Sequence, residues 1–187
     1  MENITKQEFT DYRNKTTNHD YVGSKWMFNG KIDPNHELNK DYRAITGLWA
    51  EKALQHTILQ LHDIFRFNKR LIEFSIDKLT KDIDCVFFGK SIDAKTTLRF
   101  QVDQNTKYDY FYICPVTYTS NLYSDKIIER YNGERIVNNI NPLLQYQNVK
   151  LNPKGFISME NVKQGNIGDD YFLSPKTWIS EILLLHS

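Results

Sequence analysis

Residues 82–95 carry the sequence DIDCVFFGKSIDAK, in which apolar and charged side chains alternate around a glycine. The alternation predicts two strands, and the glycine supplies the positive φ that a two-residue hairpin turn requires. We place that turn at Gly89-Lys90. In this register Asp84 lies opposite Lys95 and diagonal to Asp93. The hairpin therefore predicts two carboxylates and one ammonium group on a single face of a sheet.

The opposite face of this hairpin is predicted to be apolar. Its side chains are Ile83, Cys85, Phe87, Ile92 and Ala94. Because side chains two positions apart on a strand point the same way, Asp82 shares the acidic face with Asp84. The acidic face has two interpretations. It is either a solvated surface with ion pairs across the strands or a binding site for a cation.

The paired carboxylates of Asp84 and Asp93 suit a hard divalent cation. Two carboxylates a few ångströms apart raise each other's pKa unless a cation lies between them. Mg²⁺ takes oxygen ligands, and one or two carboxylates with a substrate phosphate complete its coordination shell. Such an ion polarises the phosphorus–oxygen bond and lowers the pKa of a bound water, and Lys95 would orient that water or neutralise the phosphate. The pattern thus favours a phosphodiester hydrolase.

A long amphipathic helix is predicted over residues 39–63, with Asn39 as its N-cap. Its apolar residues recur at intervals of three and four: Tyr42, Ile45, Trp49, Ala53, Leu54, Ile58 and Leu61. A glycine inside a helix costs about 1 kcal/mol against alanine, so Gly47 predicts that another group packs closely there. Glu51 adjoins the apolar stripe, where a charge is costly unless it is paired or binds a metal. The alternative is a surface glutamate among polar neighbours.

On these residues the chain resembles the PD-(D/E)xK nuclease superfamily, which includes type II restriction enzymes and Holliday-junction resolvases. The resemblance covers residues 40–117. Its motifs are Gly47-Leu48-Trp49-Ala50-Glu51 on a helix, Asp84 on a strand, and Asp93-Ala94-Lys95 on the next strand. It implies that Glu51, Asp84 and Asp93 bind Mg²⁺ or Mn²⁺ and that Lys95 assists the attacking water. Asp82 is the alternative to Asp84, because the spacing from Asp84 to Asp93 is short for the family.

The resemblance also implies an α/β fold with a restriction-endonuclease-like core, in which helices flank a central mixed sheet. The family has a helix between its third and fourth core strands, whereas only residues 101–107 separate the corresponding runs here. Parallel strands need a crossover of about a dozen residues. Either these residues form a single helical turn, or the strand at 109–117 pairs antiparallel. Gln101 or Gln104 matches a downstream glutamine of some branches, and we expect Gln104 to contact nucleic acid.

The remaining elements are predicted from caps, turns and periodicity. They are a helix begun by the capping box Thr5 and Glu8, a first core strand at 71–76, an interior strand at 110–114, a helix at 121–131 that ends at Asn132-Gly133, an irregular β region at 133–173, and a final helix capped by Ser174 with Pro175 in its first turn.

A basic segment, Arg66-Phe67-Asn68-Lys69-Arg70, joins the long helix to the first core strand. Cations suit contacts with phosphate, and an aromatic ring suits stacking on a base. We therefore expect Arg66, Lys69 and Arg70 to bind nucleic acid. The formal net charge is only +1, so binding would depend on such local patches.

Length and composition predict one domain over residues 1–187, with the nuclease-like core at 40–117 and residues 133–187 packing on it as an irregular segment and a helix. The chain is 40% hydrophobic, which is enough for a core without disulfides or structural metal. Its two cysteines lie in apolar runs. With no signal peptide and no long apolar run, we expect a cytoplasmic protein that does not contact membranes.

Taken together, these patterns predict a metal-dependent nuclease, with an endonuclease acting on DNA favoured. Paired cuts in a duplex commonly need two active sites, so a homodimer is compatible with this activity. Two alternatives stay open. One is an RNA endonuclease that uses the same metal site. The other is an interaction module for nucleic acid or protein that has the fold without the activity.

Overall fold

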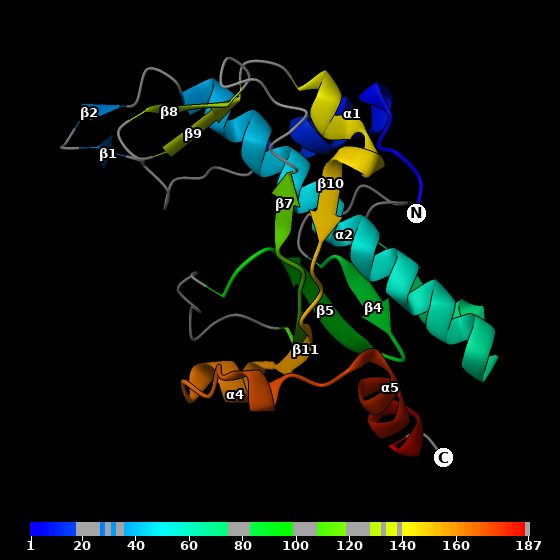
Figure 1. The fold of residues 1–187 in the computed structure, drawn as a ribbon. Coiled ribbons are helices and arrows are strands. Elements are labelled where there is room, and N and C mark those ends of the chain that lie inside the picture. The colour runs from blue at the N-terminus through cyan, green and yellow to red at the C-terminus, as the bar shows by residue number, and fades with distance from the viewer. Residues whose placement is uncertain are drawn as a thin grey trace. The chain divides into compact units, whose positions relative to one another are not determined.

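A computed structural model describes residues 1–17, 27–28, 31–32, 36–74, 83–98, 108–118, 128–131, 134–137 and 140–185 (Figure 1). Its internal contacts define two compact units. The first comprises Met1–Trp49 with Thr117–Lys150, and the second comprises Ala50–Val116 with Leu151–Ser187. The predictions for Asp82, Gln101 and Gln104 fall outside the described residues. The expectation of a single domain stays a prediction.

The chain contains both helices and strands. In order they are α1 Lys6–Thr17, β1 Met27–Phe28, β2 Lys31–Ile32, α2 His36–Phe65, η1 Lys69–Leu71, β3 Ile72–Phe74, β4 Cys85–Phe87, β5 Lys90–Lys95, β6 Tyr110–Ile113, β7 Val116–Tyr118, β8 Ile128–Tyr131, β9 Glu134–Val137, η3 Asn141–Leu144, η4 Tyr146–Asn148, β10 Val149–Leu151, β11 Gly155–Ser158, α4 Met159–Lys163, η5 Asp169–Tyr171 and α5 Pro175–Leu184. Among the described residues, no helix combines the length and apolar character needed to cross a bilayer.

The predicted capping box at the start of α1 is confirmed. The Thr5 backbone N–H donates to Glu8 Oε2 at 2.7 Å, and the Glu8 backbone N–H donates to Thr5 Oγ1 at 3.1 Å. Each side chain therefore satisfies a backbone donor that the first helical turn leaves open. The Ile4 N–H also donates to the Leu144 carbonyl, which ties the start of the chain to η3 in the first unit.

The long helix predicted over residues 39–63 is confirmed as α2, but its predicted cap is wrong. The helix begins at His36, so Asn39 lies inside its first turns. A cap preference is a local signal, and the packing of a long amphipathic helix can extend the helix past such a residue. The close packing expected at Gly47 is confirmed. A Cβ at that position would lie 2.7 Å from Tyr12 Oη, which only a glycine accommodates without a shift.

The second unit contains a five-stranded mixed sheet in the order β11-β6-β5-β4-β3. The β5 and β6 strands run parallel, and the other neighbours pair antiparallel. Parallel pairing shows that the antiparallel alternative for residues 109–117 is wrong. The connection over residues 96–109 is long enough for a parallel crossover, although the structure does not describe 99–107. The prediction of a mixed α/β fold with helices beside a mixed sheet is confirmed at this level.

The β4–β5 hairpin forms as expected, but its predicted register is wrong. The turn residues are Phe88 and Gly89, which both have positive φ, at 49° and 75°. Phe87 therefore pairs with Lys90, and Cys85 pairs with Ile92. The turn moves back by one residue because two successive positive φ values suit the twist of a two-residue hairpin.

The corrected register changes which residues are opposite each other but not which face they share. One step beyond the Cys85–Ile92 pair, Asp84 lies opposite Asp93 instead of Lys95. The partner moves by two positions, and side chains two apart on a strand point the same way. The acidic face and the apolar face are therefore the ones that the alternation predicts.

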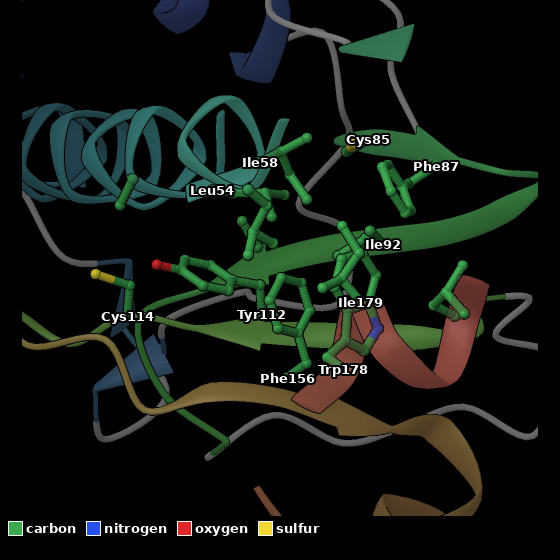
Figure 2. Close-up of a cluster of buried hydrophobic side chains, with 14 of the residues drawn as sticks. Leu54, Ile58, Cys85, Phe87, Ile92, Tyr112, Cys114, Phe156, Trp178 and Ile179 are labelled. Carbon is green, nitrogen blue, oxygen red and sulfur yellow. The ribbon is translucent and has the colours of Figure 1, made fainter. Parts of the chain in front are cut away.

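The apolar face of the sheet holds the larger core of the second unit, and α2 and α5 both contribute to it. Figure 2 shows Leu54 and Ile58 of α2 directed toward Ile92 and Tyr112 of the sheet. Trp178 of α5 stacks on Phe156, with ring centroids 3.9 Å apart and planes 6° apart (Figure 2). Cys85 and Cys114 are buried free thiols in this part of the structure.

A smaller core lies on the other face, the one that carries Asp93. Its buried members are Phe111, Ile113, Ile157 and Met159. Met159 begins α4, which contacts β11 and lies beside it in Figure 1. Since Phe111 pairs with Asp93 and Ile113 with Lys95 in the parallel register, this core borders the charged residues directly.

The predicted start of the final helix is confirmed, whereas the helix predicted over 121–131 is wrong where the structure describes it. Ser174 caps α5, and its side chain accepts from the Thr177 N–H. Residues 128–131 form β8, which pairs antiparallel with β9 so that Tyr131 lies opposite Glu134. The sequence Asn-Gly is compatible with a helix stop, but it also favours hairpins.

Candidate active site

Asp84, Asp93 and Lys95 converge on one face of the β4–β5 hairpin. Lys95 Nζ contacts both carboxylate oxygens of Asp93, at 2.9 Å to Oδ1 and 2.8 Å to Oδ2. The Asp84 carboxyl lies within hydrogen-bonding reach of Asp93. Local strand geometry explains the grouping, because Asp93 and Lys95 are two apart on β5 and Asp84 is the cross-strand neighbour of Asp93.

Backbone contacts hold Asp84 in place just before the start of β4. Its N–H donates to the Ile92 carbonyl at 3.1 Å, and its Oδ2 accepts from the Ala94 N–H at 2.7 Å. The Asp84 side chain thus accepts a hydrogen bond from the β5 backbone just beyond the last regular pair between β4 and β5. A carboxylate held by a backbone donor has little rotational freedom, so the distance between the two aspartates is well defined.

Burial is the main influence on the pKa of Asp93, which is only 4% exposed. Burial and the neighbouring Asp84 raise the pKa of the Asp93 carboxyl to about 7, although Lys95 acts in the opposite direction. Burial alone would lower the pKa of the Lys95 ammonium, but the carboxylates of Asp93 and Asp84 outweigh it and raise that pKa. The lysine therefore stays charged at neutral pH.

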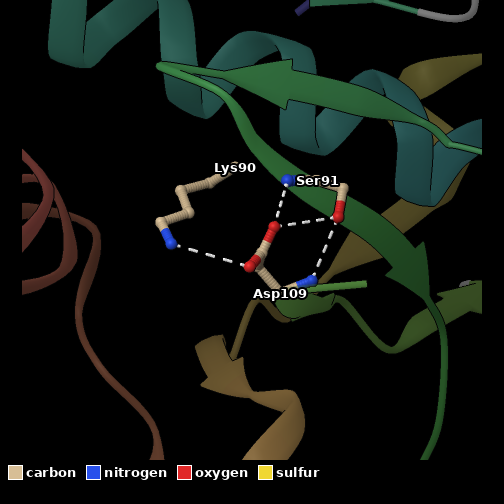
Figure 3. A network of polar contacts seen from close by, with 3 residues as sticks. All are labelled: Lys90, Ser91 and Asp109. Carbon is tan, nitrogen blue, oxygen red and sulfur yellow. Dashed lines mark hydrogen bonds and ion pairs between the residues drawn. The ribbon is translucent and has the colours of Figure 1, made fainter. Parts of the chain in front are cut away.

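A reciprocal set of hydrogen bonds locks the parallel pairing of β5 with β6 just before the site (Figure 3). Asp109 Oδ2 accepts from the Ser91 N–H at 2.8 Å and from Ser91 Oγ at 3.0 Å. In return, the Asp109 N–H donates to Ser91 Oγ at 3.1 Å, and Lys90 Nζ lies 3.6 Å from Asp109 Oδ1. The clamp sets the register in which Phe111 lies beside Asp93.

Glu51, the predicted helical ligand, is a buried residue of α2 and is 7% exposed. The helix packs through its neighbours Ala50, Ala53 and Leu54 on the face of the sheet opposite to Asp93. In the described part of the chain, no three His, Cys, Asp or Glu side chains are grouped closely enough to hold a metal ion. The structure thus brings two of the three predicted carboxylates together, and the metal role of Glu51 stays a prediction.

The predicted nucleic-acid segment is exposed except for its aromatic ring. Arg66, Lys69 and Arg70 are exposed between α2 and β3. Phe67 is buried at 8% exposure and packs edge-on against Phe87, with ring centroids 5.0 Å apart. The prediction that Phe67 stacks on a base is therefore wrong, because its ring is buried in the core. The three cations stay candidates for phosphate contact.

Two neighbours of the site, Tyr108 and Asp109, were not singled out from the sequence. Both precede the predicted strand 110–114 and carry no recognisable motif. Besides burial and the two carboxylates, the Tyr108 phenol also acts on the pKa of Lys95, so it lies near the ammonium group. The available signal was the parallel crossover itself, because the residues that lead into β6 must lie beside the start of β5.

The stability of the metal-free protein is expected to fall as pH rises from about 4 to about 7. The pKa of an aspartate in an unfolded chain is about 3.9. In the folded protein the pKa of Asp93 is about 7. Below both values the carboxyl is protonated in both states. Between them only the unfolded chain releases the proton, which favours unfolding. The loss should reach roughly 2–4 kcal/mol above pH 7, at about 1.4 kcal/mol for each pKa unit.

Urea denaturation of the wild type and of Asp93→Asn, in EDTA, measures this effect. Asparagine does not titrate, so subtraction of the two curves removes the contribution of every other group that the substitution leaves unchanged. The wild type should lose stability relative to Asp93→Asn as the pH rises. A difference that stays constant across this pH range would show that Asp93 ionises normally.

No family model, no curated protein and no solved structure matches this chain.

Proposed function

We propose that this chain is a divalent-metal-dependent phosphodiester hydrolase that acts on DNA as an endonuclease. One observation carries the proposal: Asp84 and Asp93 are cross-strand neighbours, and Lys95 lies on the same face with its ammonium group 2.8 Å from Asp93. Two carboxylates and one cation at a strand end form a compact charged site. This is the arrangement that the resemblance to PD-(D/E)xK nucleases implies, with Asp84 and Asp93 as ligands.

The donor set fits Mg²⁺ or Mn²⁺. Both groups are carboxylates, which hard cations prefer, and Mg²⁺ commonly binds through one or two carboxylates with substrate phosphate completing its shell. The raised pKa of Asp93, which burial and Asp84 cause, points the same way. Bringing a second negative charge to this face is unfavourable without a further cation, so metal binding and ionisation of Asp93 would favour each other. When bound, the metal would supply Lewis-acid polarisation of the phosphate and a water of lowered pKa.

Lys95 is suited to stabilise charge and unsuited to accept a proton. The carboxylates of Asp93 and Asp84 outweigh the effect of burial and raise the pKa of its ammonium group, so the group remains protonated near neutral pH. An ammonium group beside the reacting phosphate stabilises the negative charge that develops in the transition state. Its side chain as a whole is 42% exposed.

The choice of DNA depends on the resemblance and on the exposed cations of the basic segment. Arg66, Lys69 and Arg70 lie between α2 and β3, in the same unit as the acidic site. Cations of this kind supply affinity for any phosphate backbone without sequence preference. RNA stays an alternative substrate, because the same carboxylates and lysine could serve its cleavage.

The function is tested by incubating the wild type with single-stranded, duplex and branched DNA and with RNA. Mg²⁺, Mn²⁺, Ca²⁺ and EDTA are compared for each substrate. We expect internal cuts in DNA with Mg²⁺ or Mn²⁺, at a rate roughly 100-fold or more above that in EDTA. Ca²⁺ serves as a control that supports binding without turnover. Absence of cleavage on every substrate with both active metals would contradict the proposal.

One observation favours the inactive interaction module as a second candidate. Lys95 Nζ contacts both oxygens of Asp93, so the ion pair by itself already satisfies the buried carboxylate. A protein with this pair as a structural feature would need no metal. Titration calorimetry with Mn²⁺ separates the two candidates, since the hydrolase requires binding that Asp93→Asn removes.

A further inference from the structure

Tyr108 lies on the same face of the sheet as the acidic site, one strand away from Asp93. Its ring meets the ring of Phe111 at 63°, with centroids 5.9 Å apart. Phe111 is the direct neighbour of Asp93 in the parallel register of β5 and β6. Adjacent strands lie about 4.8 Å apart, so the residue against which the Tyr108 ring packs is one strand spacing from Asp93.

The packing around Tyr108 holds its ring in this position. It packs against the smaller core formed by Phe111, Ile113, Ile157 and Met159. The next residue, Asp109, is clamped to Ser91 by three hydrogen bonds that involve their side chains (Figure 3), and its backbone N–H also donates to the Ser91 carbonyl at 3.0 Å. The backbone that carries Tyr108 is therefore fixed to β5, and a fixed aromatic side chain loses little further entropy on binding a ligand.

We propose that Tyr108 is a substrate-binding residue of this site, whose hydroxyl donates a hydrogen bond to a phosphate oxygen held beside Asp93 and Lys95. The inference rests on the proposed function and extends it to a residue outside the PD-(D/E)xK motif. A phenol is neutral at pH 7 and has one O–H donor, which suits a non-bridging phosphate oxygen.

The phenol of Tyr110, two residues further along the chain at the start of β6, offers a matched control. Its ring packs against the opposite core, edge-on to Trp178 at 5.9 Å. Tyr110→Phe and Tyr108→Phe each remove a single hydroxyl from the same segment, on opposite faces of the sheet. Only the second is expected to affect the binding of a phosphodiester.

The experiment measures binding of a fluorescein-labelled DNA duplex by fluorescence anisotropy in Ca²⁺, for the wild type and both variants. We expect Tyr108→Phe to weaken binding about tenfold, the loss typical of one hydrogen bond to a charged group. Tyr110→Phe should bind as the wild type does. In cleavage assays with Mg²⁺, Tyr108→Phe should raise KM with little change in kcat, because the bond already forms in the bound substrate. Thermal unfolding of both variants checks that neither loses its fold.

The binding assay tests the role of Tyr108 independently of whether the protein cleaves DNA. Unchanged binding by Tyr108→Phe, or an equal loss in Tyr110→Phe, overturns the assignment. Failure of the wild type to bind the duplex overturns it as well. If the wild type binds the duplex but cleaves nothing, the hydrolase proposal fails, and a selective loss in Tyr108→Phe still supports a phosphate-binding role.

Discussion

Asp93→Asn is expected to reduce metal-dependent cleavage of DNA by roughly 10²–10⁴-fold while the protein stays folded. Asparagine keeps the shape of the side chain and can still donate to Asp84, so the hairpin loses no packing. It removes one of the two negative charges that the metal requires, and it takes away the partner that holds Lys95 Nζ at 2.8 Å. Both effects reduce stabilisation of charge in the transition state. Single-turnover cleavage with Mg²⁺, together with urea denaturation, measures the two parts of the prediction.

The exposed pair of Lys154 and Asp169 supplies the control for Asp93→Asn. Its atoms lie 3.2 Å apart, and the side chain of Asp169 is 89% exposed. Asp169→Asn breaks the same chemical pair where water screens it, so neither activity nor stability should change appreciably. Full activity in Asp93→Asn would show that the buried aspartate takes no part in cleavage.

Glu51→Gln, measured beside Asp93→Asn, tests the helical ligand that the structure does not group with the two aspartates. A loss as large as that of Asp93→Asn would mean that Glu51 reaches the metal when substrate is bound. Full activity would define a site of two carboxylates. Retained cleavage in both variants would rule out the acidic site altogether.

Trp178→Ala is expected to lower the free energy of unfolding by about 3–5 kcal/mol, the usual cost of truncating a fully buried tryptophan. Trp178 is 0% exposed and stacks on Phe156 at 3.9 Å. It also contacts Phe87, with ring centroids 5.1 Å apart, and so joins α5 to two strands of the sheet. A domain is stable by only about 5–15 kcal/mol, so the variant should be close to unfolding. Urea denaturation followed by circular dichroism checks this.

Trp178→Phe separates loss of packing from loss of the indole N–H. In the described part of the chain Trp178 Nε1 is buried and finds no hydrogen-bond acceptor, so removing it costs no bond. The phenylalanine variant should therefore lose much less stability than the alanine variant. Leu184→Ala, on the same helix at a residue 75% exposed, should stay within about 0.5 kcal/mol of the wild type. Equal losses in Trp178→Ala and Leu184→Ala would show that α5 does not hold the sheet.

Local patterns predicted the elements whose signal lies within a few residues. The Thr5–Glu8 box and the Ser174 cap were predictable because both bond partners lie within one helical turn. Two other predictions from local patterns were wrong because interactions with distant parts of the chain outweigh the local signal. Asn39 is a good cap residue, yet α2 begins at His36. Residues 128–131 form a strand because they pair with β9. The intrinsic propensities of these residues do not reveal that partner.

The candidate site was predictable in part for the same reason. Asp93 and Lys95 lie on one face because they are two residues apart on the same strand. Asp84 joins them because a short turn connects β4 to β5. Glu51 and Tyr108 depend on contacts between segments that are distant in the chain. The metal role of Glu51 therefore stays a prediction, and no local sequence pattern indicates the packing of Tyr108 against Phe111.

The amino-acid sequence by itself determined which residues of the hairpin face the core and which carry charge, because side-chain alternation is a property of each strand alone. Only the tertiary structure decided the register that places Asp84 opposite Asp93, the parallel pairing of β5 with β6, and the packing of Tyr108 against Phe111. These features depend on turn geometry and on hydrogen bonds such as those between Ser91 and Asp109. Their free energies belong to pairs of segments, so no single stretch of sequence contains them.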